Sequence, residues 1–383
     1  MRDMVFISLE NWDEIYRRNQ FICEGLARRH PESRILFVEP PDDFSHEIRR
    51  GVLPHRKNVI PSPLPHNSNI LITRPLKLFP ESFASGRAFN RLLLHRHLHR
   101  ALQLLSFNSP ILWINDHSTF HLVHHLGESA VIYDITDDWI SLNQLSEKRE
   151  RTRREDAALC KIADQVIVCS KQLYHLKSAF TDKLALIQNG VNNELFIRGI
   201  DSPAPAPPTS REWPKPVFGY TGTIHADRVD VQLLIHTAES MDAGSIVLLG
   251  PNMLSREDNA RLLATGHIIL QDPVPSTSLP DYMRAFDVCL VPHLVNPFTD
   301  SLNPIKLWEY LAVGKPIVST CVAGFRDYPE LVELVREPAD FYTAMIRSSG
   351  KAACKNEARR EVASSADWNM RVDEVEQTLW PFM

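Results

Sequence analysis

Residues 299–320, TDSLNPIKLWEYLAVGKPIVST, contain the signals for a loop, a helix, a tight stop and a strand. Asn303 is a residue type preferred at a helix N-cap, and Pro304 suits the first helical position because an N–H has no partner there. Gly314 stands where a left-handed C-cap residue is needed, and Pro316 stops the helix from continuing. The β-branched sequence IVST that follows predicts a strand. A helix that leads directly into a strand is typical of an α/β fold.

Two charged residues of this helix, Lys306 and Glu309, lie three positions apart, so their side chains emerge as neighbours. The free N–H groups of a helix N-terminus, with a lysine beside them, form an anion site. The carboxylate further along the helix is placed to bind two ribose hydroxyls. The alternative is an amphipathic helix with a surface Lys–Glu pair, and the spacing alone leaves both interpretations open.

The composition is typical of a globular chain, with 383 residues, 44% hydrophobic and 23% charged residues. This length predicts two or three domains. The net charge is −5, with a mildly basic first half and an acidic second half. This imbalance is too small to indicate nucleic-acid binding, although the first half would suit an anionic partner or a membrane surface.

Cysteine usage and hydropathy predict a cytoplasmic protein. The six cysteines are scattered without a CxxC pair, and Cys169 and Cys289 lie in apolar runs, as expected for reduced, buried thiols. The N-terminus lacks the organisation of a signal peptide. No apolar stretch approaches the roughly 20 residues that span a bilayer, so we expect a soluble chain or one at the inner face of the membrane.

The first half of the chain begins with a β-α-β pattern. Strands are predicted at 4–9 and 34–41, separated by a helix over 10–30 in which Arg18 is expected to face outward. This pattern predicts a parallel sheet covered by helices. The turn after the first strand has no GxGxxG, which argues against dinucleotide binding there. The Pro-rich, irregular stretch 42–80 is long enough to be a functional insertion.

A strongly basic helix is predicted over 81–105. Arg87 and Arg91 belong to this basic flank, together with the histidines at 95, 97 and 99. Residues two apart do not face one another on a helix, which disfavours a metal site. A solvated basic face is the main interpretation, and a patch that faces phosphate groups or a membrane is the alternative.

Polar loops follow two further predicted strands of the first half. Asn115 and His117 come after PILWI, and Asp134, Asp137 and Asp138 occur at the end of AVIYDITDD. In open α/β sheets, ligands bind at the carboxyl ends of the strands. The alternative for Asp137 or Asp138 is to cap a helix that starts at Trp139, and both roles are compatible.

The Pro-rich sequence DSPAPAPPTSREWPKP at 201–216 is the best domain boundary in the chain. We therefore predict a first domain over 1–200, a linker over 201–216 and a second domain over 217–360. The second domain opens as strand, glycine loop and helix, with Gly222 in the loop and Arg228 six residues on. A final helix in 361–383 is expected to pack back over the domain junction.

Taken together in order, several segments resemble the GT-B glycosyltransferases akin to glycosyltransferase family 4, also called group 1. The segments that carry the resemblance are YDITDDW, ADQVIVCSKQL, LIQNGVNNELF, FGYTGTI, LLGPN, LPDYMRAFDVCLVPH and NPIKLWEYLAVGKPIVST. The resemblance covers nearly the whole chain. It implies two Rossmann-like, doubly wound α/β domains facing across a cleft, with a nucleotide-diphosphate sugar held mainly by the second.

The resemblance also assigns donor-binding positions in this sequence. Glu309 matches the ribose-binding glutamate, Arg228 falls at the usual phosphate-binding lysine, and Lys306 fits a second cationic contact. The other implied donor residues are Gly222 and Thr223 in the glycine loop, Leu302 and Asn303 with their backbone N–H groups, Val274 in the base-flanking loop 271–275, and Ser301. Ser301 stands where many relatives have a glutamate, and Thr223 where a basic residue is usual, which puts the sugar identity and the standard donor contacts in doubt.

The first domain is expected to supply the acceptor side. The resemblance points to Asp134, Asp137 and Asp138 as residues that position the sugar or the acceptor, or that act as a base in an inverting reaction. Four further residues are expected on the acceptor side: Asn115, His117, Arg87 and Arg91.

The predicted activity is sugar transfer from a nucleotide-diphosphate sugar to a glycan or lipid-linked acceptor in surface polysaccharide or glycolipid biosynthesis. Retention of configuration is favoured over inversion, and no metal or cofactor is expected. Two alternatives share the fold, a sugar-nucleotide 2-epimerase and a catalytically inactive GT-B binding subunit. Nucleic acid is not an expected partner, membrane contact is expected to be peripheral, and the oligomeric state is left open.

Overall fold

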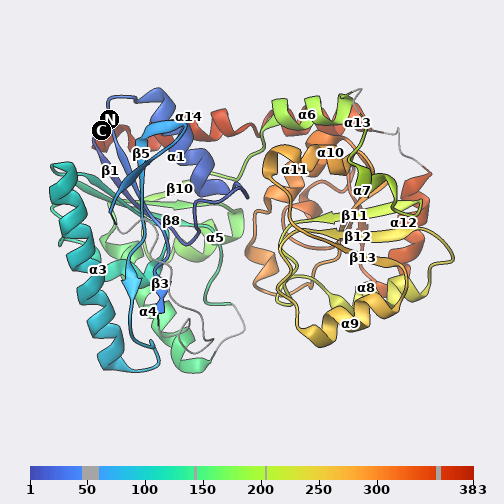
Figure 1. Ribbon diagram of the computed structural model, residues 1–383, viewed down its shortest axis with the longest axis horizontal. Helices are drawn as coiled ribbons and strands as arrows, with labels where there is room; N and C mark the ends of the chain where they lie inside the picture. The colour runs from blue at the N-terminus through green and yellow to red at the C-terminus, as the bar shows by residue number, and fades with distance from the viewer. Residues whose placement is uncertain (45–59, 142–144, 203–204, 351–354) are drawn as a thin grey trace. The chain divides into compact units, whose positions relative to one another are not determined.

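The computed structural model describes residues 1–44, 60–141, 145–202, 205–350 and 355–383 (Figure 1). The chain divides into two compact units. The first consists of Met1–Ile140, residues 145–187 and Val372–Met383, and the second runs from Gln188 to Arg371. The chain therefore leaves the first unit after Ile187 and returns to it for its last residues.

The first unit is built on a sheet with the strand order β10-β9-β8-β7-β1-β2-β5-β4. All neighbours in this sheet pair in parallel except β4 and β5. The strands are β1 (Met4–Ile7), β2 (Ile35–Val38), β4 (Ser62–Leu64), β5 (Asn67–Thr73), β7 (Ile111–Ile114), β8 (Ala130–Ile135), β9 (Gln165–Val168) and β10 (Leu184–Leu186). The short strands β3 (Asp42–Asp43) and β6 (Leu76–Lys77) pair separately.

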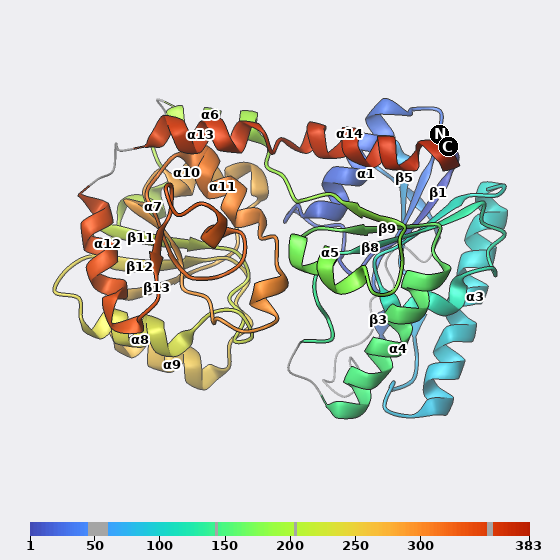
Figure 2. The same cartoon turned by 180° about the vertical axis from the view of Figure 1, so that it is seen from behind.

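Helices cover both faces of the first sheet because alternate residues of its buried strands point to opposite sides. Val5 and Ile7 of β1 belong to one core, with α3 (Ala84–Leu105), α4 (Ser146–Ile162) and α5 (Lys171–Lys177). Met4 and Phe6 belong to the other core, with α1 (Arg18–Arg29) and the end of α14 (Trp368–Leu379). Figures 1 and 2 show α1 and α14 together on one side of this sheet.

The second unit has the parallel strand order β13-β12-β11-β14-β15-β16. Numbered within the unit this is 3-2-1-4-5-6, the order of a Rossmann fold. The strands are β11 (Val217–Thr221), β12 (Ser245–Leu249), β13 (Ile268–Gln271), β14 (Val288–Val291), β15 (Ile317–Thr320) and β16 (Glu333–Val335).

Two cores also flank the second sheet. Figure 2 shows helices on both faces of this sheet. One face is covered by α6 (Asn193–Asp201), α10 (Leu279–Met283), α11 (Ile305–Val313) and α13 (Asn356–Ser364). The other is covered by α8 (Val231–Glu239), α9 (Arg256–Ala264) and α12 (Phe341–Ser349). The α/β fold with parallel sheets that the sequence predicts is thus confirmed.

The chain before α1 differs from the expectation of a helix over 10–30. The helix begins only at Arg18, because tertiary contacts hold the preceding residues in irregular structure. Glu39 accepts a hydrogen bond from the Trp12 N–H at 2.9 Å, and the Gln20 side chain caps the Arg17 N–H at 3.1 Å. The expected helix at Trp139 is also absent from the described residues, and α4 begins at Ser146.

The Pro-rich stretch 201–216 belongs to the second unit where it is described, and differs in this from the expected linker. Trp213 is buried in the core that covers one face of the second sheet, and Ser210 is buried in the short helix α7 (Pro208–Arg211). Burial of the tryptophan fixes this stretch against the unit. Of the Pro-rich stretch 42–80, which was expected to be irregular, residues 45–59 lie outside the described residues, and the described remainder contains the strands β3, β4, β5 and β6.

The burial of the described cysteines in apolar runs and of one face of the C-terminal helix agrees with what the sequence predicts. Cys169 and Cys289 are buried free thiols, while Cys354 lies outside the described residues. The expected apolar side of the last helix is buried, with Val372, Val375 and Leu379 in the core of the first unit. No helix in the described part of the chain is long and apolar enough to cross a membrane.

Candidate functional site

The helix α11 begins at Ile305, two residues after the expected cap. Asn303 does not cap it, because its side chain is engaged elsewhere: Oδ1 accepts the Asn189 N–H at 2.7 Å, and the Asn303 carbonyl accepts from Asn189 Nδ2 at 2.5 Å. Pro304 takes the N-cap position in an extended conformation. The C-terminal end is as predicted, since Gly314 is left-handed with φ 77° and caps the helix.

The start of α11 lies at the switch point of the second sheet. β11 and β14 are neighbours, yet the chain runs from β11 toward one edge of the sheet and from β14 toward the other. Ligands of open α/β sheets bind outside the strand ends at such a point. Tyr310 of α11 fixes the helix there, because its hydroxyl accepts the N–H of Thr221, the last residue of β11, at 2.9 Å.

Gly222 begins the loop after β11 and has φ 124°. A Cβ atom at this position would lie 2.4 Å from both Cε and Nζ of Lys306. Only glycine therefore permits this backbone conformation and the close approach of the lysine. Gly250 after β12 is similar, because a Cβ there would lie 2.4 Å from the Gly222 carbonyl oxygen. The two glycines bring the loop and the lysine together at the strand ends.

Two cations meet at this point, and each lies near an aromatic ring. Lys306 Nζ lies 5.3 Å from the centre of the Tyr220 ring, and the Arg228 guanidinium lies 5.3 Å from the centre of the Phe298 ring. Burial and the charge of Arg228 lower the pKa of Lys306 to about 8. Burial, with these two cations, also lowers the pKa of His293 and keeps it neutral. The result is a positive site that an anion would stabilise.

Glu309 lies one turn after Lys306. Burial raises its pKa to about 7, although the charge of Lys306 opposes that shift. No ion pair joins the two side chains among the described residues, so the surface Lys–Glu pair considered above is not formed. A half-buried carboxylate without a cationic partner in contact is suited to accept hydrogen bonds from hydroxyls.

The remaining donor positions divide into backbone N–H groups without a protein acceptor in the described chain and packed side chains. In the described part of the chain, the N–H groups of Leu302 and Asn303 donate to no protein acceptor. Ser301, in contrast, is fully buried, and its hydroxyl donates to the Phe298 carbonyl at 2.7 Å. The Thr223 carbonyl accepts from the Tyr220 hydroxyl at 3.1 Å, and Val274 packs partly buried against the core. Ser301 thus supports the loop in place of presenting its hydroxyl to a ligand.

In the first unit, Asp134 is fully buried in an ion pair with Arg18. Arg18 Nε lies 3.1 Å from Oδ2 and Nη2 lies 3.2 Å from Oδ1. The expectation that Arg18 faces outward is therefore wrong, because this carboxylate draws the guanidinium inward. Asn115 is buried beside the pair and donates to the Asp134 carbonyl at 2.9 Å. Asp134 and Asn115 hold the strand ends in place, and neither has an exposed side chain.

Three polar residues lie nearer the surface at this edge. Asp137 is half-buried, and Asp138 accepts from the Ile140 N–H at 3.3 Å. His117 opens the 3₁₀ helix η1 (His117–Leu122), and its buried Nδ1 has no hydrogen-bond partner in the described residues. Burial lowers the pKa of His117. Asp137 is thus the most accessible of the predicted carboxylates.

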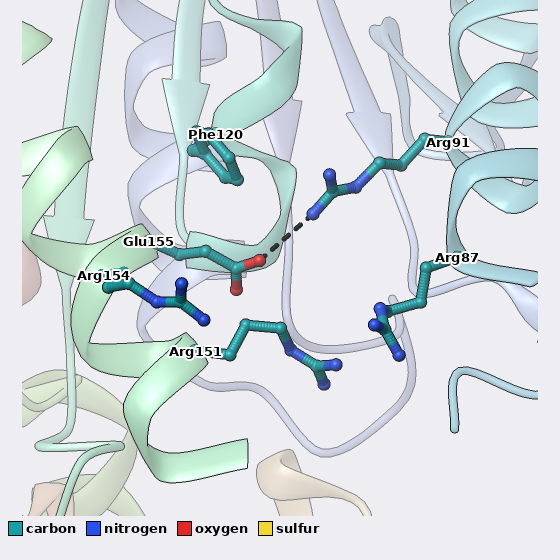
Figure 3. Close-up of a pocket in the computed structure, with 6 residues that line it drawn as sticks. All are labelled: Arg87, Arg91, Phe120, Arg151, Arg154 and Glu155. Carbon is teal, nitrogen blue, oxygen red and sulfur yellow. Dashed lines mark hydrogen bonds and ion pairs between the residues drawn. The ribbon is translucent and has the colours of Figure 1, made fainter. Parts of the chain in front are cut away.

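The two predicted arginines of α3, Arg87 and Arg91, line a pocket of about 390 Å³ (Figure 3). The histidines of the same helix form no metal centre: the described residues contain no group of three or more metal-binding side chains. His95 instead lies 3.1 Å from His121, Nε2 to Nδ1. Burial and Arg91 lower the pKa of His121 to about 3.

The second unit also matches a known family. Residues 215–349 match the model of the family described as Glycosyl transferases group 1. Residues 215–349 of the second unit thus resemble the group 1 glycosyltransferases. The chain is 28% identical over 257 residues to the putative teichuronic acid biosynthesis glycosyltransferase TuaH of Bacillus subtilis (strain 168). That match covers 62% of this chain and 64% of TuaH, so it spans somewhat less than two thirds of the relative.

Solved structures of low sequence identity show that the whole chain has the GT-B fold. Sucrose-phosphate synthase from Thermosynechococcus elongatus superposes with a TM-score of 0.74 at 15% identity, over 100% of this chain and 99% of that one. HepE of Anabaena in complex with UDP-glucose superposes with a TM-score of 0.69 at 13% identity, over 100% of both chains. The GT-B fold and the group 1 resemblance expected from the sequence are confirmed.

Sequence reasoning missed several residues of this GT-B protein. The position of Arg18 in the first helix predicts an outward side chain, because the pattern of that helix contains no sign of Asp134, 116 positions further on. His293 and Tyr220 were not singled out, although each stands at or next to the end of a predicted strand, which is the signal that could have found them. The pocket partners Arg151, Arg154 and Glu155 lie far along the chain from Arg87, so no local pattern relates them.

Proposed function

We propose that this protein transfers a sugar from a nucleotide-diphosphate sugar to a glycan or lipid-linked acceptor in surface polysaccharide biosynthesis. The observation that carries the proposal is the approach of Lys306 to Gly222 at the switch point of the second sheet, with Arg228 as a second cation. The names of two similar proteins support it: TuaH is described as a putative teichuronic acid biosynthesis glycosyltransferase, and HepE was solved with UDP-glucose.

In this proposal the second unit holds the leaving diphosphate. Lys306, Arg228 and the free N–H groups of Leu302 and Asn303 stabilise the charge that develops as the bond from the anomeric carbon to the diphosphate breaks. Because these groups are fixed before the reaction, they need little reorganisation during it. Glu309 accepts hydrogen bonds from the ribose hydroxyls.

We propose further that configuration is retained. The acceptor oxygen forms the new bond to the anomeric carbon, and its proton passes to the oxygen of the leaving phosphate. Asp134 is held at both oxygens by Arg18, which argues against a role as general base. Asp137 is then the residue that positions the acceptor or the sugar.

Calorimetry with UDP and UDP-glucose, followed by assays of nucleoside diphosphate release with and without acceptor extracts, tests the proposal. We expect donor binding, and release that depends on the acceptor. Conversion of the donor without an acceptor would instead indicate an epimerase. Tight binding with no turnover under any condition would indicate a binding subunit, and the absence of nucleotide binding would overturn the donor site.

A further inference from the structure

The first unit contains a strongly basic pocket of about 390 Å³. Arg87 and Arg91 reach into it from α3, and Arg151 and Arg154 from α4, while Phe120 of η1 and Glu155 of α4 complete the lining (Figure 3). Two helices far apart in the sequence thus direct four guanidinium groups toward one space.

The charges in this pocket do not balance. Glu155 is the one carboxylate of the lining, and it pairs with Arg91 at 3.2 Å. Burial raises the pKa of Glu155 to about 7, against the effect of Arg151 and Arg91. Arg151 and Arg154 form no ion pair in the described part of the chain. Like charges held together are unfavourable, and an anion in the pocket would offset that cost.

The two arginines of α3 in the pocket are also held in place. The Arg91 guanidinium lies 5.4 Å from the centre of the Phe120 ring while it pairs with Glu155. Arg87 donates to the Glu81 carbonyl at 2.6 Å. An ordered arginine loses less conformational freedom on binding an anion than a mobile surface side chain does.

The pocket lies toward the carboxyl ends of the strands in its own sheet. η1 follows β7 directly, and α4 follows β8, so the first turns of both elements start from that edge. Arg151 and Arg154 lie in the first half of α4, and Arg87 and Arg91 in the first half of α3. This is the edge at which open α/β sheets bind ligands.

We propose that this pocket binds a phosphate or diphosphate group of the acceptor substrate. Guanidinium groups bind phosphate oxygens in pairs of parallel hydrogen bonds, and the four arginines provide enough donors for two phosphoryl groups. The identification of this phosphate group as part of the acceptor rests on the proposed function. The binding of an anion in the pocket does not depend on it. The phosphate chemistry is shared by a soluble glycosyl phosphate and a diphosphate lipid.

The decisive test is calorimetry with pyrophosphate on the full chain, in a Lys306→Ala background that removes a cation of the donor site. Arg151→Gln should weaken pyrophosphate binding about tenfold or more, as expected for the loss of a hydrogen bond to a charged group. Arg153→Gln is the matched control, because Arg153 is exposed on the same helix, pairs with Glu150 and does not line the pocket. We expect no change in that control.

Circular dichroism of both variants verifies that they fold. No binding of pyrophosphate in the Lys306→Ala background, or equal weakening by both glutamine variants, would overturn the proposal. UDP binding, measured with Lys306 intact, should be the same with and without Arg151→Gln. If pyrophosphate fails to bind while UDP still does, the pocket assignment falls and the donor site stands.

Flotation of the chain with phosphatidylcholine vesicles, with and without a polyisoprenyl diphosphate lipid, separates the two sources of the phosphate. Capture that requires both this lipid and Arg151 supports a lipid-borne diphosphate. Binding of a soluble hexose 1-phosphate that requires Arg151, without vesicle capture, supports a soluble acceptor. If neither vesicle capture nor binding of the hexose 1-phosphate depends on Arg151, the proposal that this pocket binds the phosphate is wrong.

Discussion

Among single residues, the proposed donor site keeps Lys306 and Glu309 one turn apart with no ion pair between them in the described part of the chain. Lys306 has Gly222 and the Tyr220 ring around its ammonium group, and Glu309 forms no ion pair with it in the described chain. Burial lowers the pKa of Lys306 and raises the pKa of Glu309, so it favours the neutral form of each. Such groups cost folding stability and are retained where a ligand uses them.

Replacement of Lys306 by alanine should weaken UDP binding by about 1.5–3 kcal/mol, the loss expected for a hydrogen bond to a charged group. Calorimetry measures this change directly. Arg336→Ala is the control, since Arg336 is an exposed cation of the same unit. Unchanged affinity in the Lys306 variant would remove this lysine from the donor site.

Binding of the nucleotide should also depend on pH. The pKa of Lys306 is lowered to about 8, so the lysine loses its charge as the pH rises through that value. UDP affinity should therefore fall between pH 7 and pH 9 in the wild type. The fall should be smaller in the Lys306→Ala variant, and an equal fall in both would exclude Lys306 as its cause.

Glu309→Gln should raise stability at alkaline pH. The raised pKa means that the native carboxyl holds its proton up to about pH 7, while the unfolded chain loses it near 4.5, so ionisation costs stability as the pH rises through this window. The glutamine has no such cost, and we expect a gain of about 1 kcal/mol at pH 8 and almost none at pH 4.5.

Urea unfolding of the Glu309→Gln variant at the two pH values checks this. Glu361→Gln, at an exposed position of α13, serves as the control and should behave like the wild type. A stability change that is the same at both pH values would show that packing and not ionisation is responsible. UDP binding by the Glu309 variant should be weaker, because the ribose loses a charged acceptor.

At the element scale, a glycine loop and a helix start are built around each other. Gly222 gives the loop its positive φ and leaves space for Lys306, while Asn189 holds the segment before α11 through Asn303. Neither the loop nor the helix forms the site alone.

Gly222→Ala should therefore disturb the loop and the lysine together. The new Cβ would meet Lys306 Nζ, and alanine is strained at φ 124°, so we expect weaker UDP binding and a loss of stability of about 1–3 kcal/mol. Gly266→Ala is the matched control for backbone strain, because its φ is also positive but nothing lies near its Cβ.

A double-mutant cycle separates the two effects on UDP binding. Because Gly222→Ala acts through displacement of Lys306, its effect on affinity should largely disappear in a Lys306→Ala background. Additive losses of affinity in the double variant would contradict this coupling.

At the scale of the whole molecule, the chain completes its first unit with its last residues. Val372, Val375 and Leu379 of α14 lie in the same core as α1 and the first strands. The stability of the first unit therefore depends on a segment that is translated after the entire second unit.

Leu379→Ala should destabilise the first unit by about 2–5 kcal/mol, as for other buried leucines. In scanning calorimetry, the transition lowered by this variant should differ from the transition raised by UDP, because the proposed donor site lies in the second unit. Gln377→Ala, at an exposed position of α14, is the control. A single transition that responds to both changes would show that the units unfold as one.

The α/β class, the parallel sheets and the end of α11 follow from the amino-acid sequence alone, and its motifs in order indicate the GT-B fold. These features depend on local signals: strand runs, helical periodicity, and the need for glycine at Gly314. The proposed donor positions Gly222, Lys306 and Glu309 also lie in short, recognisable segments, and they stay predictions, although the structure brings Gly222 and Lys306 together.

Which polar side chains meet depends instead on how the folded elements pack. Asn303 does not cap α11 because its side chain accepts a hydrogen bond from Asn189, 114 positions away. Arg18 points inward because it pairs with Asp134, 116 positions away. The arginines of α3 and α4 share one pocket for the same reason. A polar side chain takes the partner that best offsets its desolvation, and that partner is set by the packing of whole elements, which no local pattern contains.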